Sequence, residues 1–209
     1  MIYGPAGSGK TTYGLCLAKQ LSSRKKAIFI DTEYGLSRER IHQLGNIHLN
    51  VYRPESYVSY HQLIEAFHRR PPRASCMIID SIAMPYRLEL ARDDPLVVNR
   101  KMAIHLDMLS SIAQKARIPI IVINHVYTPF GKQDVLPVGG DLLLYRCKCI
   151  VELQKHDKKR VALLKKHRFQ AEAGTGFIIT DQGLLPERSE HSQGPLHGED
   201  RTGVWRCPA

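Results

Sequence analysis

The sequence has few acidic residues for its size, few cysteines and no long hydrophobic run. None of its apolar stretches approaches the roughly 18 uninterrupted residues that a membrane-spanning helix needs. Its five cysteines are an odd number without a secretory signal, which argues against a disulfide framework and favours a reduced, cytoplasmic setting. The segment Cys147-Lys148-Cys149 has no second cysteine pair and therefore indicates no clear metal site. We expect its two thiols to face one side of a strand and to pack in the core.

The shortage of acids leaves a basic chain, with 30 Lys and Arg against 20 Asp and Glu and a net charge of +10. This balance favours a polyanionic partner, nucleic acid first, although ordinary surface charge for solubility is the alternative. Hydrophobic residues make up 43% of the 209 positions, which is enough for one sizeable core. We expect one domain over residues 1–185. The polar tail that follows, residues 186–209, is rich in Gly, Pro and His and is predicted to be disordered.

A glycine-rich segment lies close to the start of the chain. Residues 4–11 read GPAGSGKT and fit G-x-x-x-x-G-K-[ST], the phosphate-binding loop of many nucleotide-binding proteins. Its glycines let backbone N–H groups surround an anion, Lys10 would reach the β- and γ-phosphates, and the Thr11 hydroxyl would bind Mg²⁺. A flexible Gly/Ser loop is the alternative. Only Met1-Ile2-Tyr3 precede the loop, so we expect a shortened first strand, with the natural start upstream or the sequence itself shortened.

Apolar runs and helical stripes alternate along the rest of the chain. Strands are expected at 27–31, 47–52, 76–80 and 119–123, and helices after the glycine loop, at 37–44 with Ser37 as the cap, around 60–67 and at 102–116. Residues 85–99 carry charges and two prolines and are predicted to form a mobile loop. Later strand-like segments, at 142–153, 160–166 and 175–180, have no helices between them. The pattern predicts an α/β fold with a mostly parallel central sheet flanked by helices and a C-terminal antiparallel extension.

Polar residues follow three of the expected parallel strands, where ligands bind in such sheets. Asp80 ends one strand and would hold Mg²⁺ beside the Thr11 hydroxyl. Glu33 follows another and could polarise the water that attacks the γ-phosphate, or be a solvated loop acid. His125 ends a third and could contact the γ-phosphate or that water, or be a capping or core histidine.

Together, five segments resemble the RecA-like recombinase superfamily, in its archaeal and eukaryotic branch; they read GPAGSGKTT, IDTEYGLSRER, MIIDS, VINHV and PVGGDLL. The resemblance covers residues 1–185, and the short segment between VINHV and PVGG is most similar to a smaller archaeal paralogue of the strand-exchange recombinase RadA. It implies a RecA-like P-loop NTPase core with ATP and Mg²⁺ as cofactors. It also implies a nucleoid-associated accessory or regulator of homologous recombination and DNA repair, with weak ATP hydrolysis and little or no strand exchange.

The resemblance also assigns roles to individual residues. It makes Glu33 the catalytic glutamate, with Lys10 and His125 beside it, and Arg40 the arginine that stacks on adenine. The remaining nucleotide contacts that it implies are Gly4, Pro5, Ala6, Gly7, Ser8, Gly9, Thr11 and Thr12, with Thr11 and Asp80 on the metal. His125 departs from the family, which usually has a glutamine there that senses the γ-phosphate. An imidazole differs in reach and charge, so we expect weak coupling between ATP and DNA.

The basic residues of the second half predict a DNA-binding surface. Residues 85–99 and 126–140 match the family's first and second DNA-binding loops. Basic clusters release counterions from phosphates, and aromatic side chains can stack on single-stranded bases. The predicted contacts are Tyr127, Phe130, Lys132, Lys158, Lys159, Arg160, Lys165, Lys166, His167 and Arg168. A solvated basic turn is the alternative.

Two other functions fit the same motifs. A small-molecule P-loop kinase also begins at the glycine loop, but its arginine-rich lid is not indicated here, because the late arginines fall in expected strands. A non-catalytic module, in which ATP only fixes the shape that a partner binds, fits the His125 departure. Further partners that we predict are RadA, a Holliday junction resolvase and a second copy of the chain.

Overall fold

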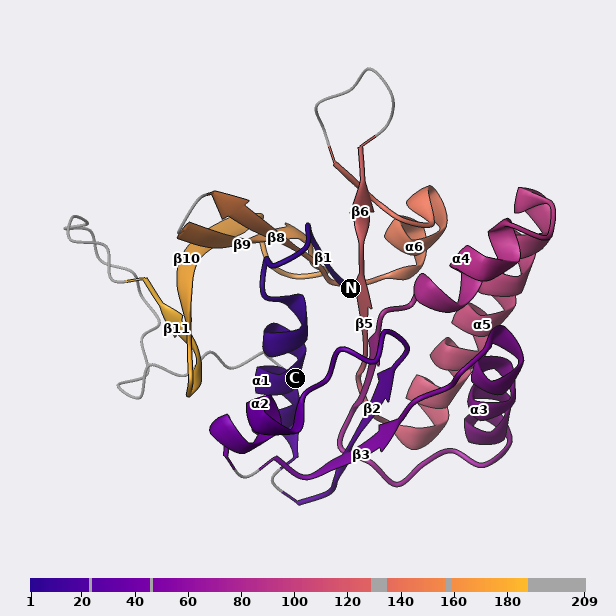
Figure 1. Cartoon of the computed structure of the whole chain (residues 1–209), viewed down its shortest axis with the longest axis horizontal. Coiled ribbons are helices and arrows are strands. Elements are labelled where there is room, and N and C mark those ends of the chain that lie inside the picture. The colour runs from indigo at the N-terminus through magenta and orange to yellow at the C-terminus, as the bar shows by residue number, and fades with distance from the viewer. Residues whose placement is uncertain (23, 46, 129–134, 157–158, 188–209) are drawn as a thin grey trace.

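The fold is built on one nine-stranded sheet, and the computed structural model describes residues 1–22, 24–45, 47–128, 135–156 and 159–187 (Figure 1). The strand order is β11-β10-β9-β8-β1-β5-β4-β2-β3. From β8 to β3 neighbouring strands are parallel, and from β8 to β11 they are antiparallel. The strands of this sheet are β1 (Ile2–Tyr3), β2 (Ala27–Asp31), β3 (Leu49–Tyr52), β4 (Met77–Asp80), β5 (Ile120–Asn124), β8 (Ile150–His156), β9 (Lys159–Lys166), β10 (Ala173–Thr180) and β11 (Gly183–Pro186).

Helices cover both faces of the parallel part. They are α1 (Lys10–Leu21), α2 (Arg38–Gln43), α3 (Tyr57–Arg69), α4 (Met84–Leu90), α5 (Pro95–Ala116) and α6 (Gly140–Arg146). The short strands β6 (Val126–Tyr127) and β7 (Leu136–Pro137) form a separate ribbon. The predicted α/β class, with a parallel centre and an antiparallel C-terminal extension, is confirmed.

Strand side chains alternate between two hydrophobic clusters, as the two-residue repeat of a strand requires. Ile28 and Ile30 of β2 face α3 and α5, whereas Phe29 between them faces α1. The strand β4 divides in the same way, so both faces of the parallel sheet are buried. This burial explains why the strands could be recognised as continuous apolar runs. Among the described residues, no helix combines the length and the apolar character needed to cross a membrane.

The predicted mobile loop at residues 85–99 is wrong, because α4 and the start of α5 occupy most of it. Both prolines lie in the first turn of a helix, where a missing N–H costs nothing. The Asp94 side chain caps α5 by accepting a hydrogen bond of 2.7 Å from the Leu96 amide. Lys101 then joins the two helices through ion pairs of 2.6 Å to Glu89 and to Asp93.

The predicted strand at residues 142–153 is half wrong. Residues 140–146 form α6, and β8 begins only at Ile150. A short leucine run fits a helix as well as a strand, and the buried Leu143 packs into the core from a helix. Cys147 consequently ends a helix instead of lying in a strand, although it does pack against the core as expected.

The other predicted elements are confirmed within a few residues. Ser37 caps α2 by accepting a hydrogen bond of 3.0 Å from the Arg40 amide. β1 has two residues, and both are buried between β5 and β8. The predicted disordered tail falls largely outside the described residues, as do Phe130, Lys132 and Lys158.

Candidate nucleotide site

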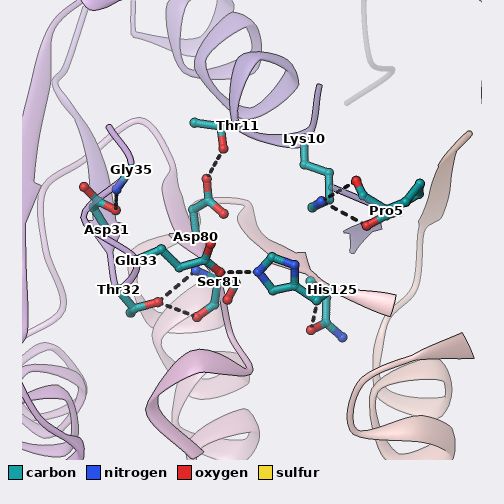
Figure 2. Close-up of polar contacts among 12 residues, drawn as sticks. Pro5, Lys10, Thr11, Asp31, Thr32, Glu33, Gly35, Asp80, Ser81 and His125 are labelled. Atoms are coloured by element: carbon teal, nitrogen blue, oxygen red, sulfur yellow. Dashed lines mark hydrogen bonds and ion pairs between the residues drawn. The ribbon is translucent and has the colours of Figure 1, made fainter. Parts of the chain in front are cut away.

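The carboxyl ends of four neighbouring parallel strands meet at one edge of the sheet. The glycine loop follows β1, Glu33 follows β2, Asp80 ends β4, and His125 follows β5. In the sheet register Asp80 lies opposite both Asp31 and Ile123, so the ends are level. Segments that are more than 90 residues apart in sequence therefore contribute side chains to one site (Figure 2).

The glycine loop is shaped by backbone that approaches neighbouring strands closely. A Cβ on Gly4 would lie 2.2 Å from the carbonyl oxygen of Leu153 in β8. A Cβ on Gly9 would lie 2.9 Å from Ile179 of β10, and Gly9 has φ +100°. Side chains are excluded at both positions, so the backbone of the loop packs directly against β8 and β10. Gly9 precedes α1, and no side chain caps the first turn of that helix.

Lys10 points back along the loop from the first turn of α1. It is 8% exposed, and its Nζ donates hydrogen bonds of 2.9 Å to the carbonyl oxygens of Gly4 and Pro5 (Figure 2). Burial lowers the pKa of Lys10, while the charges of Asp80 and Glu33 oppose that shift. A buried ammonium beside uncapped helical N–H groups suits a phosphate, so the loop fits the triphosphate of ATP. Ser8 is buried in this loop, and Thr12 lies half-buried in the first turn.

Thr11 and Asp80 place two hydrogen-bonded side-chain oxygens beside the loop. The Thr11 hydroxyl donates a hydrogen bond of 2.6 Å to Oδ2 of Asp80 (Figure 2). Burial raises the pKa of Asp80 to about 6, although the hydrogen bond from Thr11 acts in the opposite direction. A buried carboxylate and a hydroxyl suit Mg²⁺, which usually takes one or two protein oxygens and completes its shell with phosphate oxygens and water. No group of three or more metal-ligating side chains occurs among the described residues.

Glu33 and His125 contact one another directly. Nε2 of His125 and Oε1 of Glu33 form a hydrogen-bonded pair, and both side chains are about 30% exposed (Figure 2). This contact lowers the pKa of Glu33, although partial burial of the carboxyl raises it. The structure therefore places the expected catalytic acid against the residue that departs from the family pattern. A link between these two residues could not be inferred from their positions in the sequence.

Thr32 fastens the Glu33 loop to the end of β4. Its hydroxyl donates to the Ser81 carbonyl oxygen at 2.8 Å and accepts from the Ser81 amide at 2.9 Å. Asp31 fastens the other side of the same loop by accepting hydrogen bonds from the amides of Gly35 and Leu36. Sequence reasoning missed these supporting roles, because each bond joins the loop to backbone whose position depends on the fold.

Arg53 is a further residue that the motifs did not indicate. Its Nε lies 3.0 Å from Oδ2 of Asp31, and its Nη2 donates to the Leu36 carbonyl oxygen at 2.7 Å. The only available signal was that Arg53 follows β3, the strand beside β2. The position of Arg53 after β3 indicates a contact with Asp31 only when β3 is known to lie beside β2.

Asn124 ties the end of β5 to the expected DNA-binding segment. Its side-chain amide donates a hydrogen bond of 2.7 Å to the Val138 carbonyl oxygen, and its own oxygen accepts one from the His125 amide. The Val138 amide in turn donates to the His125 carbonyl oxygen at 2.9 Å. The residue that contacts Glu33 is thus also the first residue of the segment that leaves the sheet at β6.

Arg40 lies apart from the Glu33 pair, on α2. Its Nη1 donates to the Gln43 side chain at 3.1 Å and to the Asp181 carbonyl oxygen, in the β10–β11 turn, at 3.4 Å. Burial raises the pKa of the Cys16 thiol in α1, and the charge of Arg40 opposes this shift. Arg40 therefore links α2 to the β10–β11 turn of the antiparallel extension.

The predicted DNA contacts are distributed over several surfaces. Tyr127 is exposed on β6, and Lys166 donates a hydrogen bond of 2.8 Å to the Leu144 carbonyl oxygen. Nδ1 of His167 accepts from the Phe169 amide, and Arg168 between them is exposed. The exposed Phe169 was not among the predicted contacts. Lys159, Arg160 and Lys165 lie on β9.

Comparison with known proteins identifies the family of this chain. Residues 1–186 match the Rad51 family model. The DNA repair and recombination protein RadB of Methanosphaera stadtmanae is 35% identical, over 88% of this chain and 85% of that protein. The protein of the same name from Thermococcus gammatolerans is also 35% identical, over 88% and 87%. A crystal structure of the RadB recombinase superposes with a TM-score of 0.71 at 31% identity, covering 88% of this chain and 87% of that one. The chain has the RecA-like recombinase fold and belongs to the Rad51 family, among the RadB proteins.

Proposed function

We propose that this protein is an ATP-binding, weakly ATP-hydrolysing DNA-binding protein that acts as an accessory or regulator in homologous recombination and DNA repair. Its relatives are named for DNA repair and recombination, and RecA-like recombinases are generally ATPases. The observation that carries the proposal is the convergence of Lys10, the Thr11–Asp80 pair and Glu33 at one sheet edge. These are the parts that phosphoryl transfer to water requires.

The chain's own residues would divide the work of hydrolysis. The loop amides and Lys10 would hold the triphosphate and neutralise charge as the bond to the γ-phosphoryl group breaks. Thr11 and Asp80 would hold Mg²⁺, which supplies further charge neutralisation when it is bound. Glu33 would orient the attacking water through its carboxylate. Arg40 would stack on the adenine from its place on α2 beside the β10–β11 turn.

The contact between Glu33 and His125 supports slow turnover. One oxygen of the carboxylate is engaged by the imidazole, and the lowered pKa of Glu33 makes it a weaker base. Both effects reduce its capacity to accept a proton from water. The same contact favours a second candidate function, a non-catalytic module in which ATP fixes shape without turnover.

A groove beside the ribbon supports the DNA-binding part of the proposal. It has a volume of about 650 Å³ and lies between α5, β6 and the start of α6. Arg100 and Tyr127 supply a cation and an aromatic ring, Asp141 supplies one carboxylate, and Gly139 and Gly140 leave backbone accessible. A cation and a stacking surface at the base of both expected DNA-binding segments suit a single strand. RadA, a Holliday junction resolvase and a second copy of the chain stay predicted partners.

The direct test measures ATP hydrolysis and DNA binding on one sample of the wild-type protein and of Lys10→Ala. Wild type should bind Mg-ATP and hydrolyse it slowly, and Lys10→Ala should lose both properties while remaining folded by circular dichroism. A folded wild-type protein without Mg-dependent affinity for ATP would contradict the proposal. Glu33→Gln separates the two candidates, because it lowers hydrolysis only if wild type turns ATP over through Glu33.

A further inference from the structure

One face of the antiparallel extension covers the glycine loop. The backbone of Leu153 in β8 lies against Gly4, and the side chains of Phe177 and Ile179 in β10 lie against Gly9. Leu153 lies opposite Ala162 in the β8–β9 ladder, and both are buried with Phe177 in one hydrophobic cluster. Because side chains alternate along a strand, every second residue of β8, β9 and β10 faces the loop and α1.

That face also presents two cations to the loop. Lys155 and Arg160 are directly paired across the β8–β9 ladder, two positions along from Leu153 and Ala162. Nζ of Lys155 lies 3.7 Å from the position that a Cβ on Gly7 would occupy. Nε of Arg160 donates to the Gly7 carbonyl oxygen at 3.4 Å. Both cations therefore converge on the middle of the glycine loop.

The neighbouring lysines of the same hairpin lie on the opposite face. Lys159 is 3.8 Å from Glu187 and Lys165 is 3.9 Å from Glu172, so each has an acidic partner. A Cβ on Gly176 would contact Glu187. Gly176 precedes Phe177 on β10 and so faces the side of the sheet opposite to it, which places Glu187 on that opposite face. The basic residues of the hairpin therefore form two sets on opposite faces of the sheet, with Lys155 and Arg160 on the loop face and Lys159 and Lys165 on the other.

The pair on the loop face lacks an acidic partner. Among the described residues, neither Lys155 nor Arg160 forms an ion pair. Like charges directly opposite one another in a ladder repel. A bound polyanion on the glycine loop would relieve this repulsion, and the phosphate tail of a nucleotide is the polyanion that the loop fits.

We propose that Lys155 and Arg160 act on the nucleotide from within the same chain, a role that rests on the proposed binding of ATP by the loop. Lys155 is a second phosphate-binding lysine that adds to Lys10. Arg160 is a positioning residue that fixes the Gly7 carbonyl, and with it the orientation of the adjoining amides. DNA phosphates are left to the residues of the opposite face, Lys159 and Lys165 among them.

The test compares dissociation constants for Mg-ATP and Mg-ADP in wild type, Lys155→Ala and Arg160→Ala. Lys165→Ala is the matched control, because it removes a lysine of the same hairpin from the opposite face. We expect Lys155→Ala to weaken ATP binding about tenfold and ADP binding about twofold, since the triphosphate carries the additional charge. Arg160→Ala should also weaken ATP binding, and Arg160→Lys should restore only part of it, because a lysine cannot reproduce the guanidinium geometry.

Other measurements separate this role from a structural one. In the nucleotide-free protein, Lys155→Ala should not lower the thermal midpoint, because the substitution removes a like-charge repulsion, and it should leave the salt dependence of DNA binding unchanged. The inference is overturned if wild type binds ATP while Lys155→Ala and Lys165→Ala leave the ratio of ATP to ADP affinity equal to that of wild type. A wild-type protein that binds neither nucleotide overturns the proposed function itself, and this inference with it.

Discussion

The parallel and antiparallel parts of the sheet place their polar residues by different rules. In the parallel part, Lys10, Glu33, Asp80 and His125 all follow or end strands, and the strand ends lie level at one edge. In the antiparallel part, the basic residues lie within strands, where successive side chains point to opposite faces of the sheet. A residue at a strand end can shift by one position and still reach the site, whereas the same shift within a strand moves a charge to the other face.

The two parts of the sheet meet at the pairing of β1 with β8, beside the glycine loop. We call this pairing the seam; its two strands are about 150 residues apart in sequence, and β1 contributes only two residues to it. The close approach of Gly4 to Leu153 and the pair of cations over Gly7 both belong to this seam. The antiparallel extension therefore forms one wall of the candidate nucleotide site as well as a continuation of the sheet.

The largest expected effect comes from breaking this seam with Gly4→Ala. The new Cβ would lie 2.2 Å from a backbone carbonyl oxygen, and neither backbone can yield without moving β1 or β8. We expect unfolding to become easier by more than about 4 kcal/mol, measured by chemical denaturation. Gly35→Ala is the control, because a Cβ there has nothing within 4 Å. Equal stability of the two variants would contradict the close packing of the two parts.

Two acids that face one another at the site edge should respond oppositely to neutralisation. Burial raises the pKa of Asp80 from 3.8 to about 6, so the folded protein binds this proton more tightly than the unfolded chain. The resulting stability is present below pH 4 and is lost as the pH rises through 6. At pH 7 without ligand, Asp80→Asn should therefore raise the free energy of unfolding, by up to about 3 kcal/mol. Mg-dependent ATP binding should be lost.

Asp31→Asn is the matched control for this prediction, since Asp31 pairs with Asp80 in the sheet register. Asp31 accepts hydrogen bonds from two loop amides and pairs with Arg53, so neutralising it should destabilise the fold. Denaturant unfolding of both variants at pH 4 and pH 7 gives the comparison. A loss of stability in Asp80→Asn at pH 7 would show that its carboxylate is favourable without ligand.

The contrast between the two parts also explains how much the sequence could reveal. The parallel strands were recognisable because burial on both faces makes them continuous apolar runs, and the glycine loop, Glu33 and Asp80 lie beside them. The contact between Glu33 and His125 depends on β4 lying between β2 and β5, which periodicity does not specify. The helix at 84–90 could not be recognised, because a proline in a charged segment favours a loop although it also fits the first turn of a helix. The residue roles assigned from the family pattern stay predictions.

The basic β8–β9 hairpin shows what the sequence could not reveal about the antiparallel part. Lys159, Arg160 and Lys165 were all predicted to contact DNA, as members of one basic cluster in the sequence. Strand alternation and the ladder register divide it, with Lys155 and Arg160 on the loop. The pairing register of β8 and β9 decides which basic residues face the loop, and a composition argument has no access to it.

An intermediate effect is expected from His125→Gln, which restores the residue that the family usually has. The contact with His125 lowers the pKa of Glu33, so replacing the imidazole should raise that pKa and free one carboxylate oxygen. We expect single-turnover ATP hydrolysis to rise about tenfold, as a stronger base assists water attack. Carbon NMR titration of the Glu33 carboxyl should show the upward shift directly. Unchanged titration together with unchanged hydrolysis would mean that His125 does not restrain Glu33.

The smallest expected effect tests whether the outer face of the hairpin is the DNA-binding side. The double substitution Lys159→Ala and Lys165→Ala removes two cations that lie away from the glycine loop. Each phosphate contact contributes about 0.7 to 0.9 to the slope of log affinity against log salt, so the slope should fall by roughly 1.5. Binding of Mg-ATP should stay as in wild type, because neither lysine contacts the loop. Fluorescence anisotropy with a labelled single strand at several salt concentrations measures the slope. Lys155→Ala is the reciprocal control, and a larger loss of slope in that variant would place DNA on the loop face and remove the distinction between the two faces.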